Sequence, residues 1–454
     1  MTNTTERQRH QPADEPREPS RRRLLRPPTL RNSDGHDHDE RHATWFELFF
    51  DLVFVAAIAQ LTSAFLADPN LAGLGRFAAL FVPVWWVWMT LTFYLDRFDT
   101  DDVGHRAIVL TAMVLAVALA ADVPRAFNGD VRPFVLTFVV LRSLQFGLDL
   151  RVRHFVPAVR GLDRAGVPLS IVVVAAWLVA LGLPGAWVYL LFGTALAVDI
   201  VRTRLSQRVR ALPVNPVHLT ERFGTFLLIV LGESMVQLVG ATTRHPWSVS
   251  AAVVFVSAFT TITILWWLSF NGLQEITSGD NPRAVNRFAT TQSVMVGSLA
   301  AASAGLSVAV VAANGGGTIE LAPRIALYGG VALYLVAAAS SVPRSRRPYA
   351  VVTRAAAAVA SAALVYMGAV VKPVLLVPSH TIILVSAVAI EGLLNRSALA
   401  SGSIRRRGRA LFDWFGVRVH RFGDALTAPP AGVPDGPPVL RDYPVARAHR
   451  SSRR

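Results

Sequence analysis

The sequence contains no cysteine. Disulfide bonds and thiolate metal sites are therefore excluded. Charged residues are also scarce: they make up 17% of the chain, whereas an average soluble domain has about 25%. Lysine is nearly absent, and Lys372 is the only one among the 45 basic residues. We attribute this arginine excess to a GC-rich genome and not to a need for bidentate arginine chemistry.

We also expect no cleavable signal peptide, because residues 1–44 are polar and have no apolar core. We expect them to form a disordered cytoplasmic tail, since they are too polar to bury a core. His36, His38 and His42 lie in this tail beside acidic residues, and such a cluster can bind Zn²⁺ or Ni²⁺ weakly. A solvated tail is the interpretation we prefer, so we expect no metal and no cofactor.

Long apolar runs are what the sequence has most of, and 52% of its residues are hydrophobic. Short polar breaks separate the runs, which is typical of multi-span helical membrane proteins. We predict an all-α polytopic membrane helix bundle over residues 45–395, with about 12 transmembrane helices. The expected spans are residues 45–66, 77–95, 106–121, 131–148, 167–182, 185–201, 219–240, 247–270, 288–311, 324–342, 349–371 and 377–394.

The split between the fifth and sixth spans is only Leu183-Pro184, and merging them would give eleven spans. The distribution of charge among the loops favours an even number of spans. With the amino terminus inside, the inner loops hold 15 arginines and the outer loops 6 basic residues. This excess agrees with the positive-inside rule. We therefore expect a multi-pass protein of the bacterial plasma (cytoplasmic) membrane, the inner membrane, with both termini in the cytoplasm.

The net charge of +15 would suggest a nucleic-acid partner in a soluble protein. Here the arginines lie mostly in loops and tails, so topology and anionic lipid headgroups at the inner face explain them better. We expect no nucleic-acid partner. Residues 396–454 form a basic cytoplasmic tail, in which 404–422 could be an interfacial amphipathic helix. A frayed basic tail is an equally good interpretation.

The two halves of the bundle, residues 45–201 and 219–394, resemble each other. Glu47-Leu-Phe in the first span is matched by Glu221-Arg-Phe in the seventh, 174 residues later. Trp85-Trp86 in the second span is matched by Trp266-Trp267 in the eighth. We predict a 6+6 internal repeat whose halves enter the membrane from the same side, as in some transporters. The alternative is coincidence among helices of similar composition.

The first span carries two acids, although a carboxylate within lipid costs several kcal/mol, from about 2.5 upward. Glu47 and Asp51 are four residues apart, so they share one helix face. One of two such close acids could hold a proton near neutral pH. Gln60, in the same span, points to a nearly opposite face. These three residues are candidates for binding a proton or a solute.

The seventh span has Glu221 and Arg222 at its inner end. Glu233 lies about two-thirds along it, and Gln237 follows one turn later on the same face. We assign Glu221, Glu233 and Gln237 to the same candidate binding set. The acids nearest the span ends could instead reach the interface or cap a helix.

A second set of residues consists of candidates for a structural ion pair or a gate: Arg142, Asp199, Arg222 and Glu391. Asp199 and Glu391 end the sixth and twelfth spans. Arg142 is the one arginine that we place well inside an apolar run, so it needs a carboxylate partner. Asp51 and Glu233 are the expected partners, and the sequence does not choose between them.

Two further patterns have structural interpretations. Gly297, Ala301 and Gly305 are four residues apart and form a small-residue packing face. The Gly315-Gly-Gly run is not followed by a phosphate-loop lysine. No catalytic triad, zinc helix or nucleotide fingerprint is present, so we predict that the protein is not an enzyme.

Two motifs resemble those of a known family. They are RHATWFELFFDLVFVAAIAQL at Arg41–Leu61 and ERFGTFLLIVLGES at Glu221–Ser234. Both are similar to motifs of the bacterial low temperature requirement A family, and the resemblance covers roughly residues 41–395. It implies a multi-pass inner-membrane protein. It supplies no reaction and no proven functional residue.

Two hypotheses follow from the sequence. In the first, the protein is a secondary transporter of an unknown solute, with proton coupling through Asp51 and Glu233 as an option. In the second, it is a non-transporting sensor or lipid-interacting envelope factor, and its buried acids pair with Arg142 for stability. The expected partners are the lipid bilayer and a small solute or proton. The oligomeric state is left open.

Overall fold

The computed structural model describes residues 27–30, 44–99, 103–157, 166–206, 212, 214–243, 247–273, 282–342 and 348–400. The chain divides into a unit of residues 1–393 and a second unit of residues 394–454. The helices belong to the first unit, and the last of them continues into the second. The tail histidines and the segment 404–422 lie outside the described residues.

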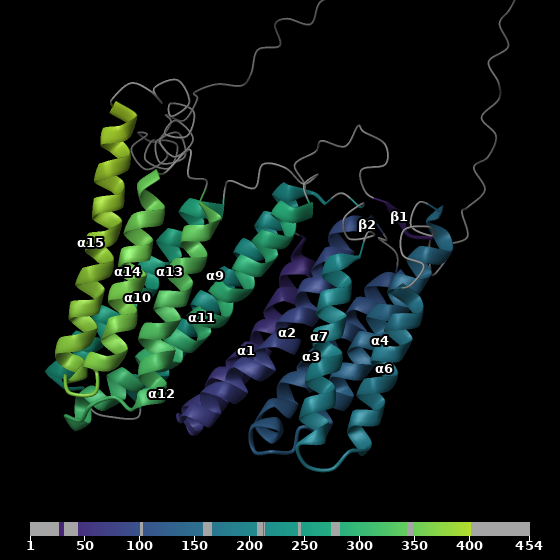
Figure 1. The fold of residues 1–454 in the computed structure, drawn as a ribbon, viewed down its shortest axis with the longest axis horizontal. Coiled ribbons are helices and arrows are strands. Elements are labelled where there is room, and N and C mark those ends of the chain that lie inside the picture. The colour runs from purple at the N-terminus through teal and green to yellow at the C-terminus, as the bar shows by residue number, and fades with distance from the viewer. Residues whose placement is uncertain are drawn as a thin grey trace, which may run out of the picture. The chain divides into compact units, whose positions relative to one another are not determined.

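The described part of the chain is helical apart from one two-residue strand pair, which confirms the all-α prediction. The first half contains α1 (Trp45–Ala67), α2 (Leu71–Arg97), α3 (Val103–Phe127), α4 (Arg132–Phe155), α6 (Gly166–Gly182) and α7 (Trp187–Leu205). The second half contains α9 (Pro216–Thr243), α10 (Val249–Leu273), α11 (Pro282–Gly315), α12 (Leu321–Arg324), the π-helix η1 (Ile325–Gly329), α13 (Gly330–Ser341), α14 (Pro348–Met367) and α15 (Pro373–Ala400). Figure 1 shows these elements.

By length and composition, 10 stretches of helix in the described residues can cross a membrane. The turn at Leu183-Pro184 does separate two helices, α6 and α7. Neither of them is among the ten: α6 has only 17 residues, and the last turns of α7 carry Asp199, Arg202 and Arg204. A multi-span helical bundle is therefore confirmed, whereas the number twelve stays a prediction.

A short piece of the amino-terminal tail pairs with the bundle. Strand β1 (Thr29–Leu30) runs antiparallel to β2 (Phe98–Asp99), with Thr29 opposite Asp99. Pro28, just before β1, is buried. These residues depart from the disordered tail that we predicted for residues 1–44, because the main chain after α2 offers them backbone hydrogen bonds.

Polar caps define where the first two helices begin. Thr44 caps α1, since its hydroxyl accepts a hydrogen bond from the Glu47 N–H at 3.3 Å. The Glu47 carboxylate accepts in return from the Thr44 N–H at 2.9 Å, which completes a capping box. Asn70 caps α2 through the Gly73 N–H at 2.8 Å. The capping box fixes Glu47 at the start of α1, one turn before Asp51.

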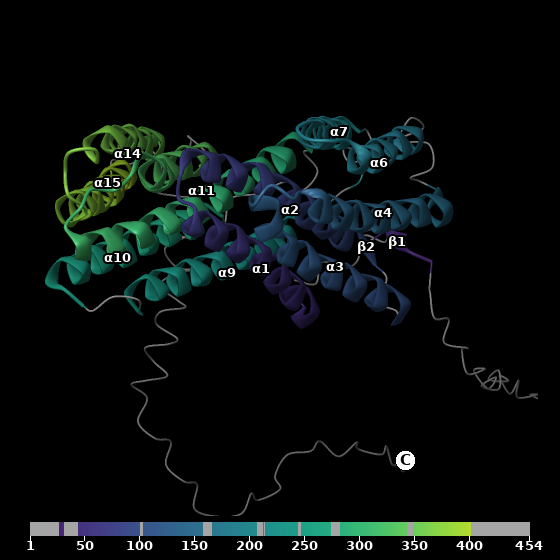
Figure 2. The same cartoon turned by 90° about the horizontal axis from the view of Figure 1, so that it is seen from below.

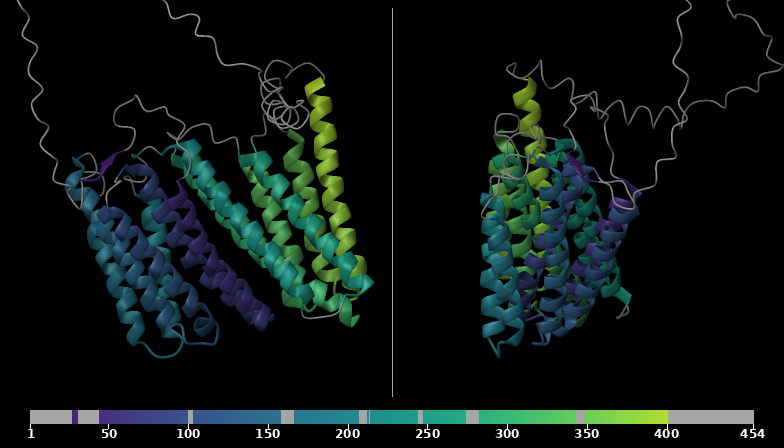
Figure 3. Two further views of the ribbon diagram at one scale, coloured as in Figure 1. Left: turned by 180° about the vertical axis from the view of Figure 1, so that it is seen from behind. Right: turned by 90° about the vertical axis from the view of Figure 1, so that its right-hand side faces the viewer.

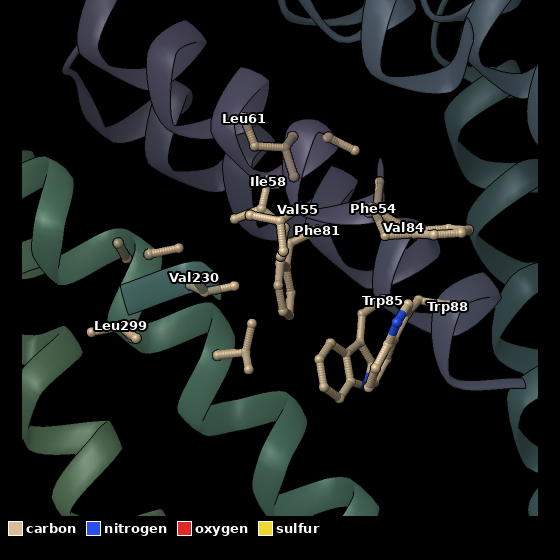
Figure 4. Packing of buried hydrophobic residues seen from close by; sticks show 14 of the residues in the cluster. Phe54, Val55, Ile58, Leu61, Phe81, Val84, Trp85, Trp88, Val230 and Leu299 are labelled. Carbon is tan, nitrogen blue, oxygen red and sulfur yellow. The ribbon is translucent and has the colours of Figure 1, made fainter. Parts of the chain in front are cut away.

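Apart from Glu47, Asp51 and a few uncharged polar residues, helix α1 is apolar on all sides. One face, which includes Phe54 and Ile58, is buried against α2, α3 and α9. The other face exposes Phe49 and Leu52, which are 51% and 53% accessible. An exposed apolar face is normal for a helix whose solvent is lipid. Figure 4 shows the buried face of α1 next to Phe81 of α2 and Val230 of α9.

Helices at corresponding positions along the two halves of the chain make similar contacts. In the first half, α1 packs on α2 and α3, and α3 packs on α4. In the second half, α9 packs on α10 and α11, and α11 packs on α13. The halves meet where α1 and α2 contact α9 and α11 (Figures 2 and 3). The residues described next lie at this junction and at the neighbouring helix ends.

Candidate functional site

Arg222 of α9 is the centre of a buried charge network. Its side chain has no exposed surface. It donates to both oxygens of Asp51 on α1, from Nη2 to Oδ1 at 2.7 Å and from Nε to Oδ2 at 3.1 Å. A second acid of α1 is close by, because Arg222 Nη1 lies 3.4 Å from Glu47 Oε1. Both acids of the first span therefore face the arginine of the seventh.

Helix periodicity explains how four side chains meet here. Glu47 and Asp51 are one turn apart on α1, and His218 and Arg222 are one turn apart on α9. Glu47 lies opposite His218, and Asp51 lies opposite Arg222. Contacts in this order require α1 and α9 to run in the same direction. The shared face that we predicted for the two acids is what makes the match possible.

His218 connects the network to α2. Its Nδ1 lies 2.8 Å from Asp96 Oδ1, and its Nε2 lies 3.4 Å from Glu47 Oε2. Asp96, in the last turn of α2, also accepts a hydrogen bond from the Asn215 N–H at 3.1 Å. The imidazole thus lies between two carboxylates, with all three side chains buried.

Aromatic rings exclude water from the Asp51–Arg222 pair. Trp88 of α2 donates from its indole N–H to Asp51 Oδ1 at 2.8 Å. The guanidinium carbon of Arg222 lies 5.7 Å from the centre of the Phe50 ring. Further rings pack around Trp88, namely Trp85, Phe223 and Phe226. Figure 4 shows Trp85 and Trp88 beside each other on α2. In such an apolar surrounding, charges interact strongly and unpaired charges are costly.

A second buried cluster lies on the other side of α2. Asp199 of α7 accepts from Arg142 Nη2 at 2.5 Å, from Arg202 Nη2 at 2.8 Å and from the Trp86 indole N–H at 2.8 Å. Our expectation that Arg142 pairs with Asp51 or Glu233 is therefore wrong. Asp51 already accepts hydrogen bonds from Arg222 and Trp88. Helix α4 packs mainly on α3 and α6, and to a smaller extent on α2, so Arg142 does not reach α1 or α9.

A third buried pair joins α14 and α15. Arg354 donates to both oxygens of Glu391, from Nε at 3.0 Å and from Nη2 at 2.9 Å. Its Nη1 donates to the Ala338 carbonyl of α13 at 3.0 Å. Arg142 is thus not the only arginine buried in a span, because Arg222 and Arg354 are buried too. Both lie near the starts of their spans, where solvent exposure is the usual expectation.

The remaining predicted residues do not join Asp51. Glu233 is half-buried and accepts from Gln237 Nε2 at 2.7 Å, and Gln237 also reaches Ser63 Oγ of α1 at 3.4 Å. Glu233 lies eleven residues beyond Arg222 on α9, which is about 16 Å along a helix. Gln60 is exposed, and Glu221 is half-buried. Asp51 and Glu233 therefore do not converge on one cavity.

A pocket opens beside the second cluster. It has a volume of about 100 Å³ and is formed by the ends of α2, α4 and α7, by Leu212 and by the start of α11. Four arginines line it: Arg97, Arg142, Arg202 and Arg204. Residues of both halves contribute, since Asn286 and Ala289 belong to α11. Arg204 also bonds across the junction, from Nη1 to the Thr290 hydroxyl at 2.7 Å.

Sequence reasoning missed several of these residues, namely Trp86, Trp88, Asp96, His218 and Arg354. Asp96 and His218 carried a usable pattern. Both lie at span ends that the loop charges place on the same membrane side as Glu47. Of the pocket arginines, Arg97, Arg202 and Arg204 were counted only as markers of topology. Their second role depends on three loops meeting in space, which no single segment of sequence reveals.

The chain is similar to known proteins over most of its length. A family model described as bacterial low temperature requirement A protein matches residues 42–389. An uncharacterized protein of Rhizobium meliloti (strain 1021) is 28% identical over 271 residues. The match covers 54% of this chain and 63% of that relative, so the chain spans less than two thirds of the relative's length. No solved structure matches the chain.

Proposed function

We propose that this chain, which belongs to the bacterial low temperature requirement A family, is a secondary transporter of a small solute in the bacterial inner membrane. The observation that carries the proposal is the pocket between the halves. Its wall includes side chains from α2, α4 and α7 of the first half and from α11 of the second. A site walled by both halves is what alternating access requires, because rocking of one half against the other then opens or closes it.

The equivalent contacts of the halves support this mechanism. Each first helix packs on the second and third helix of its own half, and α1 and α9 run in the same direction. We propose that the halves are two copies of a six-helix repeat related by an axis along the membrane normal. Two similar halves that enter from the same side can move as two bodies about the solute between them.

The Arg222 network would act as the joint between these bodies. Arg222 and His218 of the second half bond to Glu47, Asp51 and Asp96 of the first. These bonds are confined to the first turns of α9, whereas most of α1 and α9 meets through apolar side chains (Figure 4). With a strong tie at one membrane side and only the 3.4 Å contact of Gln237 with Ser63 further along, the opposite ends can separate at a lower cost.

The experiment is solute uptake by proteoliposomes. Vesicles with the full-length chain are incubated with an isotope-labelled small-molecule extract of bacteria, and retained solutes are identified by mass spectrometry. The Thr203→Trp variant fills the pocket with an indole ring, because Thr203 lines it. The Val201→Trp variant is the matched control, since Val201 is 55% exposed on the same helix.

We expect at least one solute to accumulate with the parent and with the Val201→Trp control, but not with Thr203→Trp. The proposal fails if no solute exceeds its level in protein-free vesicles. It also fails if Thr203→Trp retains the same solutes as the parent.

A non-transporting membrane protein is the second candidate. The complete pairing of the buried acids favours this candidate, because Asp51, Asp199 and Glu391 each accept hydrogen bonds from a buried arginine. In that case the pairs serve stability alone, and uptake is absent while the fold is intact. The same uptake experiment separates the two functions.

A further inference from the structure

The arginine pocket has an excess of positive charge. Arg142 and Arg202 share a single carboxylate, Asp199, which lies behind the pocket wall and not in it. Two guanidinium groups and one carboxylate leave one positive charge. Arg204 adds another, because it bonds to the Thr290 hydroxyl and to no carboxylate among the described residues. Arg97 is the fourth arginine of the pocket wall, and Asp149 is its acidic residue. Four arginines against Asp149 and Asp199 leave two positive charges.

The arginines are held in place rather than left mobile. Arg142 donates to the Gln145 side chain and to the Thr90 hydroxyl, as well as to Asp199. Arg202 donates to Asp199 and to the Gly166 carbonyl at 3.4 Å. The Nε–H groups of Arg142 and Arg202 are buried and have no acceptor among the described residues. The pocket wall thus carries arginines that hydrogen bonds hold in place and that have more N–H groups than acceptors.

The chemistry of the guanidinium group limits the class of ligand that the pocket can bind. Arginine presents a rigid set of N–H donors that matches the oxygens of phosphate and carboxylate groups. A cation is excluded by the net charge, and an apolar ligand would displace water from the arginine N–H groups that line the pocket without replacing its hydrogen bonds. A volume of about 100 Å³ holds several waters or one small oxyanion, since a water needs about 10–15 Å³ by this measure.

We infer that this pocket binds a phosphate-type oxyanion. The inference also names a class of solute for the proposed transporter, namely small oxyanions. That part of it rests on the proposed function. The loop charges assign this end of the bundle to the cytoplasm, so the ligand would enter from that side. A free anion and an anionic lipid headgroup share the required chemistry.

The first test is calorimetric titration of the full-length protein in a neutral detergent with inorganic phosphate, at constant low ionic strength. Arg204→Gln is the informative variant, because Arg204 has one neutral partner and its removal leaves no buried acid unpaired. We expect its Kd to rise by about tenfold, the loss expected for one charge-assisted hydrogen bond. Arg76→Gln is the control, since Arg76 is 46% exposed at the other end of α2. Its Kd should not change.

The inference is overturned if the parent does not bind phosphate, or if Arg204→Gln binds it as tightly as the parent. Since a variant could lose binding through misfolding, each is also checked for an unchanged melting temperature without phosphate. An Arg204→Lys variant keeps the charge but loses the planar donor set, so an intermediate Kd supports the geometric argument.

Two further measurements identify the source of the oxyanion and separate this inference from the transport proposal. Binding is repeated in nanodiscs of phosphatidylcholine alone and with added phosphatidylglycerol. Competition by phosphatidylglycerol assigns the site to a headgroup, and its absence assigns it to a free anion. In proteoliposomes, phosphate binding without any uptake keeps the anion site and rejects transport. Uptake of other solutes without phosphate binding rejects the anion site and keeps transport.

Discussion

Arg222 donates two hydrogen bonds to Asp51 across the interface of α1 and α9, at 2.7 Å and 3.1 Å, and neither side chain has exposed surface. The two residues are 171 positions apart in the chain. They come from the two most distinctive motifs of the sequence, FELFFD and ERFG. Each motif therefore supplies the counter-charge of the other, and the pair joins the first helix of one half to the first helix of the other.

The first prediction concerns this pair. Arg222→Gln leaves Asp51 buried with only the Trp88 indole as a donor, so we expect it to lower the free energy of unfolding by about 3–5 kcal/mol. Asp51→Asn should cost less, because Glu47 lies 3.4 Å from Arg222 and still compensates its charge. The double variant should recover much of the loss. Denaturant titration in detergent measures all three, and additive effects would contradict the pairing.

The second prediction concerns Arg354. Arg354→Lys keeps the charge but cannot donate to both oxygens of Glu391 and to the Ala338 carbonyl with the same geometry. We expect a lower melting temperature than the parent, although the substitution is formally conservative. Arg76→Lys, at an exposed salt bridge, should leave the melting temperature unchanged, because exposed pairs contribute about 0–1 kcal/mol. Equal melting temperatures for both variants would refute the role of Arg354.

The sequence predicted the elements better than their partners. Apolar runs and polar breaks are local properties, so each predicted span overlaps a helix of the structure, with ends that differ by up to seven residues. The shared face of Glu47 and Asp51 follows from the helix period alone. The partner of Arg142 could not be found in this way. It depends on which helix packs against α4, and Asp51, Asp199 and Glu233 have the same chemistry in sequence.

The π-helix η1 shows a second limit. Residues 321–341 look like one apolar helix in sequence, but at Ile325–Gly329 the backbone hydrogen bonds change from the α-helical to the π-helical pattern. There the chain lies against α11, where a Cβ on Gly305 would come within 2.7 Å of the Pro323 carbonyl and the Leu327 amide nitrogen. Sequence predicted a small-residue packing face at Gly305. It could not say that the facing helix would change its winding at that contact.

The third prediction follows from that contact. Gly305→Ala forces α11 away from η1, because the new methyl group meets backbone atoms that cannot rotate aside. We expect a loss of about 1–3 kcal/mol in the free energy of unfolding, as for other overpacked sites. Gly240→Ala is the control, since Gly240 is exposed on α9 and a methyl group added there would have no neighbouring atom within 4 Å. That variant should be neutral or slightly more stable. An unchanged free energy of unfolding in Gly305→Ala would show that the contact between α11 and η1 has room for a methyl group.

The fourth prediction concerns topology. Because the chain has no cysteine, a single introduced thiol reports its own position without background labelling. Asn128→Cys, in the exposed turn between α3 and α4, should react with a membrane-impermeant maleimide in intact cells. Val103→Cys, 69% exposed at the other end of α3, should react only after the membrane is opened. The reverse pattern would place the amino terminus outside and invert the assignment of the pocket.

The fifth prediction separates proton coupling from solute binding. Glu233 bonds to Gln237 and to no basic side chain among the described residues, so its carboxyl group can gain or lose a proton without breaking an ion pair. Asp51 lacks that freedom because Arg222 holds both of its oxygens. Glu233 is therefore the acid of the predicted set that is better placed to carry a proton.

If the transporter is proton-coupled, Glu233→Gln should abolish accumulation driven by a pH gradient while solute exchange at equal pH continues. Ser63→Ala removes the weaker 3.4 Å contact of Gln237 and is the matched control, with both activities retained. Gradient-driven accumulation that survives in Glu233→Gln at the level of the parent would remove Glu233 from the mechanism, because glutamine at this position has no acidic proton to release.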